Sequence, residues 1–94
     1  MALHCLSAAP GSEAFSRCLS LAASGDAILL MGDACYAILP DSDYASALSR
    51  CPASVSVLAV DAATRGLSVG KIQRTNSEGF VALTEAHQQQ LAWY

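Results

Sequence analysis

Short apolar runs divide the chain at regular intervals. Residues 2–6 (ALHCL), 26–31 (DAILLM) and 54–61 (SVSVLAVD) have the length and composition of strands, and the third run is the clearest because it is β-branched. The second run has no polar alternation, which is typical of a central strand covered on both faces. A weaker strand is predicted around residues 69–75.

Helical periods separate these runs. In residues 12–25, four apolar positions follow the i, i+3, i+4, i+7 spacing of one helix face: Phe15, Cys18, Leu19 and Ala22. Ser12 is a plausible N-cap and Gly25 a C-terminal stop. The first helix is therefore predicted to be amphipathic, with Cys18 on its inward face.

A second helix is predicted after the central strand. Residues 32–39 (GDACYAIL) leave the sheet through a turn, and either Asp41 or Asp43 can cap the helix that follows. This helix has to end before Pro52, whose ring cannot be accommodated in a helix interior.

Two more helices are predicted in the last third of the chain. Asp61 can cap a short helix that Gly66 closes. Residues 77–94 are predicted to form one final helix with a stripe along one side: Phe80, Leu83, Thr84, His87 and Leu91.

Strands that alternate with helices require crossover connections, which indicate a parallel or mostly parallel sheet with helices on both faces. The predicted fold is a small three-layer α/β/α, Rossmann-like arrangement with about four to five strands. Ninety-four residues close a single hydrophobic core, so residues 1–94 are predicted to form one domain.

The composition adds an expectation about assembly. Hydrophobic residues make up 53% of the chain and charged residues only 14%, against roughly 25% charged residues in an average soluble domain. A small domain has much surface to cover, so this excess indicates an obligate oligomer that self-associates when its partners are missing. The alternative is close packing, because much of the excess is alanine and valine.

The charges and the apolar runs bear on two kinds of partner. The net charge is −3, and the five cations are scattered singly, which argues against direct nucleic-acid binding: Arg17, Arg50, Arg65, Lys71 and Arg74. The first residues carry no basic export signal, and the longest apolar run is far too short to span a bilayer. We therefore expect a cytoplasmic protein without a membrane partner.

The cysteine pattern favours free thiols. The four cysteines form no Cys-x-x-Cys pair, and His4 and His87 are far apart, so a zinc site is not expected: Cys5, Cys18, Cys35 and Cys51. In the cytoplasm disulfides are disfavoured, which leaves core packing or redox chemistry. The sequence contains no phosphate loop, dinucleotide-binding fingerprint or nucleophile elbow, and we expect no cofactor.

Thiol chemistry is the remaining catalytic option, because a cysteine thiolate can accept persulfide sulfur without a cofactor. Cys18, in the middle of a helix, gains nothing from the helix N-terminus and is on physical grounds more typical of inert core. Cys5 is similar. Cys35 follows a strand end and could be exposed, although a nearby Asp33 charge would raise its thiol pKa.

Four other side chains are candidates for binding or contact. His4 could orient a thiol, but a lone histidine in an apolar strand is more often a core residue with a backbone hydrogen bond. Asp33 is by default a turn residue. Tyr36 and Trp93 could anchor an interface; a frayed C-terminal end is the competing interpretation for Trp93.

Four segments together resemble the DsrH/TusB family of sulfur-relay proteins over nearly the whole chain: LHCLSAAP, GDAILLMGDACYAIL, LAVDAATRGL and GFVALTEAHQQQLAW. The typical family pattern is Leu-His-Thr-Leu, a Gly-Asp followed by apolar residues and Asp-Gly-Val-Tyr-Ala, Ala-Arg-Gly-Leu, and Gly-Phe-Val-x-Leu-Thr with a terminal Trp. His4, Asp33, Tyr36 and Trp93 match motif positions and are interface candidates.

The resemblance implies a DsrEFH-like α/β subunit that joins TusC/DsrF-like and TusD/DsrE-like sister subunits in a dimer of heterotrimers. In the Tus branch such a complex passes persulfide sulfur from a TusA-type carrier toward TusE and 2-thiolation of the tRNA wobble uridine. In the Dsr branch it serves dissimilatory sulfur oxidation. The principal cysteine belongs to the TusD/DsrE-like subunit, so this chain is expected to be an accessory or non-catalytic member.

The resemblance also bears on the thiols. Some DsrH-type members carry a cysteine in the first helix, which makes Cys18 a candidate persulfide site, whereas other TusB proteins have an apolar residue there. Cys35 stands where the family has Val or Ile, so we predict that it does not react. A self-sufficient thiol sulfurtransferase that uses Cys18 or Cys35, and a homo-oligomeric module without sulfur chemistry, remain alternatives.

Overall fold

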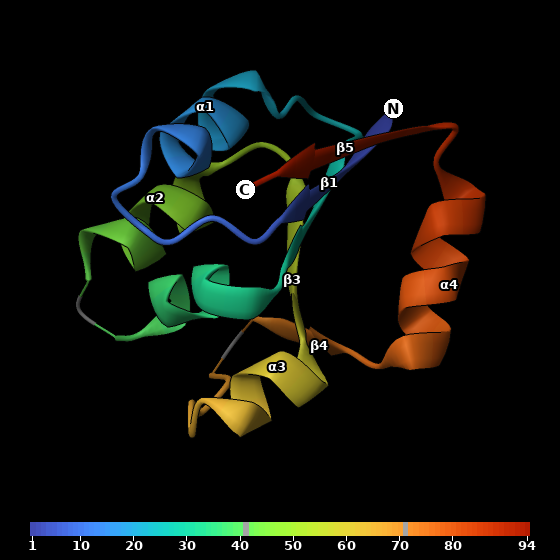
Figure 1. Ribbon diagram of the computed structural model, residues 1–94. Helices are drawn as coiled ribbons and strands as arrows, with labels where there is room; N and C mark the ends of the chain where they lie inside the picture. The colour runs from blue at the N-terminus through green and yellow to red at the C-terminus, as the bar shows by residue number, and fades with distance from the viewer. Residues whose placement is uncertain (41, 71) are drawn as a thin grey trace.

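A parallel sheet forms the centre of the fold (Figure 1). We describe a computed structural model, which covers residues 1–40, 42–70 and 72–94. Within them the five strands lie in the order β4-β3-β2-β1-β5, and each neighbouring pair is parallel. The strands are β1 (Ala2–Leu6), β2 (Ala27–Leu30), β3 (Ser54–Leu58), β4 (Gln73–Thr75) and β5 (Gln89–Trp93). The sequence prediction of a mostly parallel α/β sheet is confirmed.

Helices cover both faces of this sheet. Figure 1 shows α1 and α2 together on one side and α4 alone on the other, while α3 lies near the end of β3. The helices are α1 (Glu13–Leu21), α2 (Asp43–Arg50), α3 (Ala59–Thr64) and α4 (Ser77–Ala86), with a 3-10 helix, η1 (Gly32–Ile38), between β2 and α2. The arrangement is the predicted three-layer fold.

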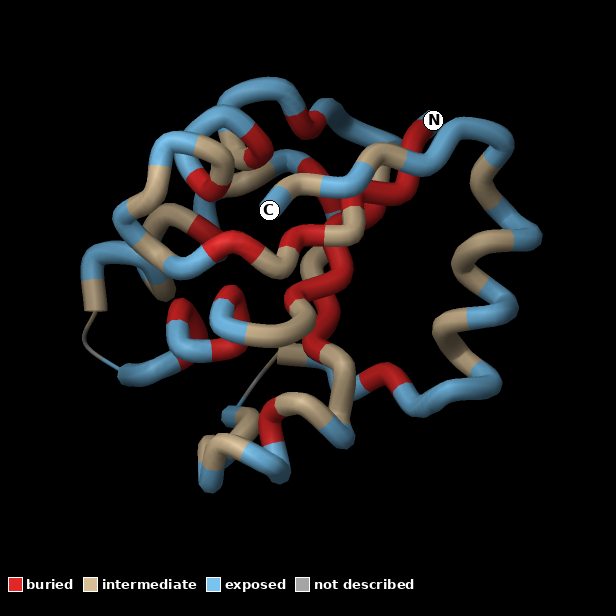
Figure 2. Tube along the Cα trace, viewed as in Figure 1, coloured by how far each residue is buried: buried red, intermediate tan, exposed pale blue. Residues whose placement is uncertain are grey.

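Strand alternation sorts the core into two clusters. Side chains two residues apart share a face, so Ile28 and Leu30 of β2 lie on the α1 and α2 side, whereas Ala27 and Leu29 lie on the α4 side. The first cluster is the larger, and all four residues of β2 are buried. Figure 2 shows the buried residues gathered on the central strands, whereas α4 contributes no buried residue.

Serine residues are the N-caps of α1 and α2, the two helices on the side of the larger core cluster. The Ser12 hydroxyl accepts the Phe15 N–H at 3.2 Å, as predicted for α1. The Ser42 hydroxyl accepts the Ala45 N–H at 3.0 Å, so Ser42 is the N-cap of α2. The prediction of an aspartate cap was wrong for Asp43, which is the first helical residue, and Asp41 lies outside the described residues.

The largest departure from the sequence prediction is at the end of the chain. The predicted helix over residues 77–94 stops at Ala86, and residues 89–93 form β5 against β1. The physical reason is the open edge of β1, whose backbone N–H and C=O groups need partners. In this strand, Leu91 and Trp93 lie on one face of the sheet, two residues apart.

Smaller departures shift element boundaries. The strand predicted over 54–61 ends at Leu58, and α3 begins at Ala59, so Asp61 lies inside the first turn of α3 and is not its cap. The strand predicted around 69–75 is shortened to β4, at one edge of the sheet. Among the described helices, the longest has ten residues, and none has the length and hydrophobicity required to cross a bilayer.

Candidate functional site

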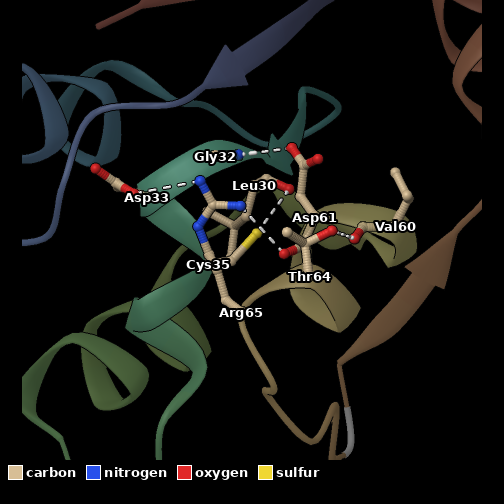
Figure 3. A network of polar contacts seen from close by, with 8 residues as sticks. All are labelled: Leu30, Gly32, Asp33, Cys35, Val60, Asp61, Thr64 and Arg65. Carbon is tan, nitrogen blue, oxygen red and sulfur yellow. Dashed lines mark hydrogen bonds and ion pairs between the residues drawn. The ribbon is translucent and has the colours of Figure 1, made fainter.

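The carboxyl ends of β2 and β3 meet at one edge of the sheet, where ligands bind in many α/β folds. Chain direction changes there at Gly32, which has a φ of +54°, a left-handed conformation that favours glycine. The Gly32 N–H donates to Asp61 Oδ2 at 2.8 Å (Figure 3). Asp61 therefore ties the start of η1 to α3.

An ion pair makes a second connection between these elements. The Arg65 guanidinium donates to Asp33 Oδ1 at 3.3 Å and to the Asp61 carbonyl at 3.2 Å (Figure 3). Asp33 is 64% exposed, so the pair contributes little to stability. In this arrangement the Asp33 carboxylate bridges η1 to α3.

Cys35 lies inside this cluster but is not accessible. Its side chain is fully buried, and its Sγ donates to the Leu30 carbonyl at 3.7 Å. Burial raises the pKa of the Cys35 thiol to about 11, with a further contribution from the Asp61 charge. The structure places the thiol in the core, whereas its sequence position after a strand end also allowed an exposed thiol.

Cys18 lies on the inner face of α1, as its spacing predicted. It is fully buried in the first core cluster, and burial, together with the neighbouring Cys51, raises the pKa of its thiol to about 12. Neither feature activates a thiol, because the thiolate is the nucleophile. Cys5 and Cys51 are half-buried, and burial also raises the pKa of Cys5.

His4 and Trp93 are brought together on the α1 side of the sheet. The Trp93 indole N–H donates to His4 Nδ1 at 3.0 Å, and His4 Nε2 is 3.0 Å from Asp26 Oδ2. The sequence expectation of a buried histidine was right, but the expectation of a backbone partner was wrong, because both partners are side chains. Trp93 is half-buried in an ordered strand and is not frayed.

Besides Asp33, Tyr36 is the sequence candidate whose side chain is exposed. It lies on η1 with 41% of its surface exposed, next to the buried Cys35. Two residues that the sequence reasoning did not select, Asp26 and Arg65, organise the contacts of His4 and Asp33. A carboxylate directly before a buried strand was the available signal for Asp26.

No described cavity gathers the candidate residues. A groove of about 400 Å³ lies between α4 and strands β3 and β4, and none of the candidate residues lines it. In residues 1–40, 42–70 and 72–94 there is no cluster of three or more His, Cys, Asp or Glu side chains suited to a metal ion.

Thiol accessibility gives a direct test of this geometry. With iodoacetamide at pH 8, we expect Cys51 to be alkylated first and Cys18 and Cys35 to react on the order of 100-fold more slowly, because both are buried and poor in thiolate. Peptide mass spectrometry over time gives the four rates. In urea the rates should converge; fast native labelling of Cys18 would contradict its burial.

The sequence and the fold of this chain are similar to those of known proteins. The family described as "DsrH like protein" matches residues 9–90. Curated relatives named "Protein TusB" from Yersinia pestis (strain Pestoides F) and Yersinia pseudotuberculosis (serotype O:1b, strain IP 31758) are each 42% identical over 95 residues, covering 97% of this chain and 99% of the relative. The crystal structure of the ychN protein from E. coli has the same fold, with a TM-score of 0.72, 17% identity, and coverage of 98% of this chain and 97% of that chain.

Proposed function

Because the chain belongs to the DsrH family, we propose that it is a subunit of a cytoplasmic sulfur-relay complex whose main role is structural. Its partners in this proposal are a TusC/DsrF-like and a TusD/DsrE-like sister subunit, in a dimer of heterotrimers that receives sulfur from TusA-type and delivers it to TusE-type carriers. The TusB name of the 42% identical relatives favours tRNA wobble-uridine 2-thiolation over the dissimilatory branch.

The burial of the Cys18 and Cys35 thiols is the observation that carries the structural role. In persulfide transfer, an incoming thiolate attacks the outer sulfur of the donor persulfide, the S–S bond breaks, and the donor leaves as a thiolate. Both thiols are fully buried with raised pKa values, so in this fold neither offers an accessible thiolate. Burial thus agrees with the resemblance to the DsrH/TusB family, which implies that the principal accepting cysteine belongs to the TusD/DsrE-like sister subunit.

Exposed apolar side chains support a partner-binding role. They occur on several elements, among them Leu21 of α1, Tyr36 of η1, Val60 of α3 and Val81 of α4. Single exposed apolar residues are common on monomers, so this support is weaker than that from thiol burial. Tyr36 is the strongest contact candidate, because aromatic side chains are enriched at interfaces and η1 is fixed by Asp61.

Sulfur loading of the assembled complex tests this proposal. The chain is co-expressed with its candidate sister subunits, the complex is loaded from a persulfide donor, and each cysteine is read by mass spectrometry. We expect one added sulfur atom on the TusD/DsrE-like subunit and none on the cysteines of this chain, the half-buried Cys5 and Cys51 included. A Cys18→Ala variant is expected to assemble and to transfer sulfur at the wild-type rate.

The alternatives predict different results in the same experiment. Sulfur on Cys18 within the complex would make this chain a participant in transfer and would imply that α1 moves. Sulfur on the isolated chain would favour a self-sufficient sulfurtransferase. Failure to associate with either sister subunit would overturn the proposed assembly.

A further inference from the structure

A continuous chain of polar contacts runs from the loop before β2 through β1 to β5. Asp26 Oδ2 is 3.0 Å from His4 Nε2, and His4 Nδ1 is 3.0 Å from the indole nitrogen of Trp93. The His4 side chain is 2% exposed, and its ring stacks on Trp93 with the centroids 6.2 Å apart. This chain, Asp26–His4–Trp93, lies on the sheet face that also carries Ile28 and Leu30.

The donors and acceptors in this chain fix the protonation of His4. An indole N–H can only donate, so His4 Nδ1 has to accept and carries no proton. A carboxylate can only accept, so the single ring proton lies on Nε2 and points at Asp26. The contacts as described therefore require neutral His4 in one tautomer.

The charged surroundings of His4 are simple. Hydrogen bonds from the backbone N–H of Ala2, from His4 and from the N–H of Ala23 hold the pKa of Asp26 well below its usual range, so Asp26 stays ionised in mild acid. On α1, the buried titratable group is the Cys18 thiol, which stays neutral because its pKa is raised. The register neighbours of His4 are apolar, Ile28 on β2 and Leu91 on β5.

We propose that the Asp26–His4–Trp93 chain is an acid-sensitive latch on the edge strand β5. When a proton from solvent binds Nδ1, the imidazolium keeps its bond to Asp26 as an ion pair, but an N–H now faces the indole N–H. Two donors cannot share a hydrogen bond, so Trp93 is released while His4 stays in place. The latch thus opens on the β5 side only.

Release of Trp93 acts on a strand that has one neighbour. Within the described part of the chain, β5 pairs with β1 alone, and the Trp93 carbonyl accepts the N–H groups of Ser7 and Ala8 at 2.9 and 3.2 Å. Displacement of Trp93 therefore disturbs the end of β5 and its hydrogen bonds to the loop that leads to α1. This inference does not depend on sulfur transfer, because it concerns only contacts within the chain.

The test uses Trp93 as its own reporter, since it is the only tryptophan of the 94 residues. The full-length protein is titrated from pH 8 to pH 5 while tryptophan fluorescence is recorded, and amide exchange of residues 89–93 is measured and corrected for the intrinsic effect of pH. Loss of one hydrogen bond corresponds to roughly a 2- to 10-fold change, so we expect corrected exchange to rise by this factor, together with a fluorescence transition.

Two substitutions isolate His4. His4→Gln offers an oxygen to the indole and an N–H to the carboxylate but does not titrate in this range, so it should abolish both transitions. The matched control is His87→Gln, which removes the only other histidine, bonded to the Leu83 carbonyl at 2.9 Å, and should leave them unchanged. Transitions that persist in His4→Gln, or are absent from the wild type, would overturn the proposal.

A second variant covers the case in which His4→Gln does not fold. Trp93→Phe keeps the ring packing and His4 but removes the donor, so His4 protonation has no indole to displace. The corrected exchange of residues 89–93 should then be raised already at pH 8 and show no step toward pH 5. A step of wild-type size in this variant would contradict the latch.

Discussion

Phe15→Ala is expected to lower the free energy of unfolding by about 3–5 kcal/mol, the cost of removing a large aromatic side chain from a core. Phe15 is 1% exposed in the first core cluster, and its ring packs edge-on against Tyr44 at a centroid distance of 5.7 Å. A domain with a total stability of roughly 5–15 kcal/mol would be left close to unfolding. Urea unfolding followed by circular dichroism and by Trp93 fluorescence measures the loss.

Leu21→Ala is the matched control on the same helix. Leu21 is 64% exposed, so its truncation should change the free energy of unfolding by no more than about 0.5 kcal/mol. If both substitutions had the same small effect, α1 would not pack on the sheet as described, and the burial of Cys18 would lose its basis.

Trp93→Ala is expected to cost about 3 kcal/mol, at the lower end of the range for aromatic truncations because Trp93 is only half-buried. The substitution removes packing against the first core cluster, the stacking on His4 and the hydrogen bond to His4 Nδ1. The buried imidazole is then left with an unsatisfied acceptor, which adds to the cost. Urea unfolding by circular dichroism measures the effect, since the fluorescent side chain is gone.

Two further substitutions, Tyr94→Ala and Trp93→Phe, separate the contribution of the Trp93 hydrogen bond from that of its packing. Tyr94 is 89% exposed, so its loss should be nearly neutral, whereas Trp93→Phe keeps most of the packing and should cost about 1 kcal/mol for the hydrogen bond. If Trp93→Ala were as mild as Tyr94→Ala, β5 would not be docked through its tryptophan.

The central strands could be predicted because their apolar runs are local signals. β2 is buried over its whole length, and an uninterrupted apolar run of that length has few other stable placements. The end of the chain could not be predicted in the same way. Residues 88–90 are glutamines, which favour helix on intrinsic propensity, and only the distant edge of β1 makes residues 89–93 a strand.

Among the candidate residues, the sequence predicted some placements but not the contacts. The inward face of Cys18 follows from helical spacing, and the structure has it there. The burial of Cys35 does not follow from any local pattern, because it depends on η1 folding back against the carbonyl of Leu30. Asp26 is 22 residues from His4 in sequence, and no local pattern indicates that the two side chains meet.

The pairing of β5 with β1 has a consequence for synthesis on the ribosome. β1 is made first, yet its second neighbour is residues 89–93, so the sheet edge beside Leu3 and Leu6 stays open until almost all of the described chain has emerged. Such long-range pairing is slow, because a long loop has to close before the contact is gained. Until residues 89–93 emerge, the nascent chain therefore carries one unpaired edge of an apolar strand, and an exposed strand edge of this kind makes a folding intermediate prone to aggregation.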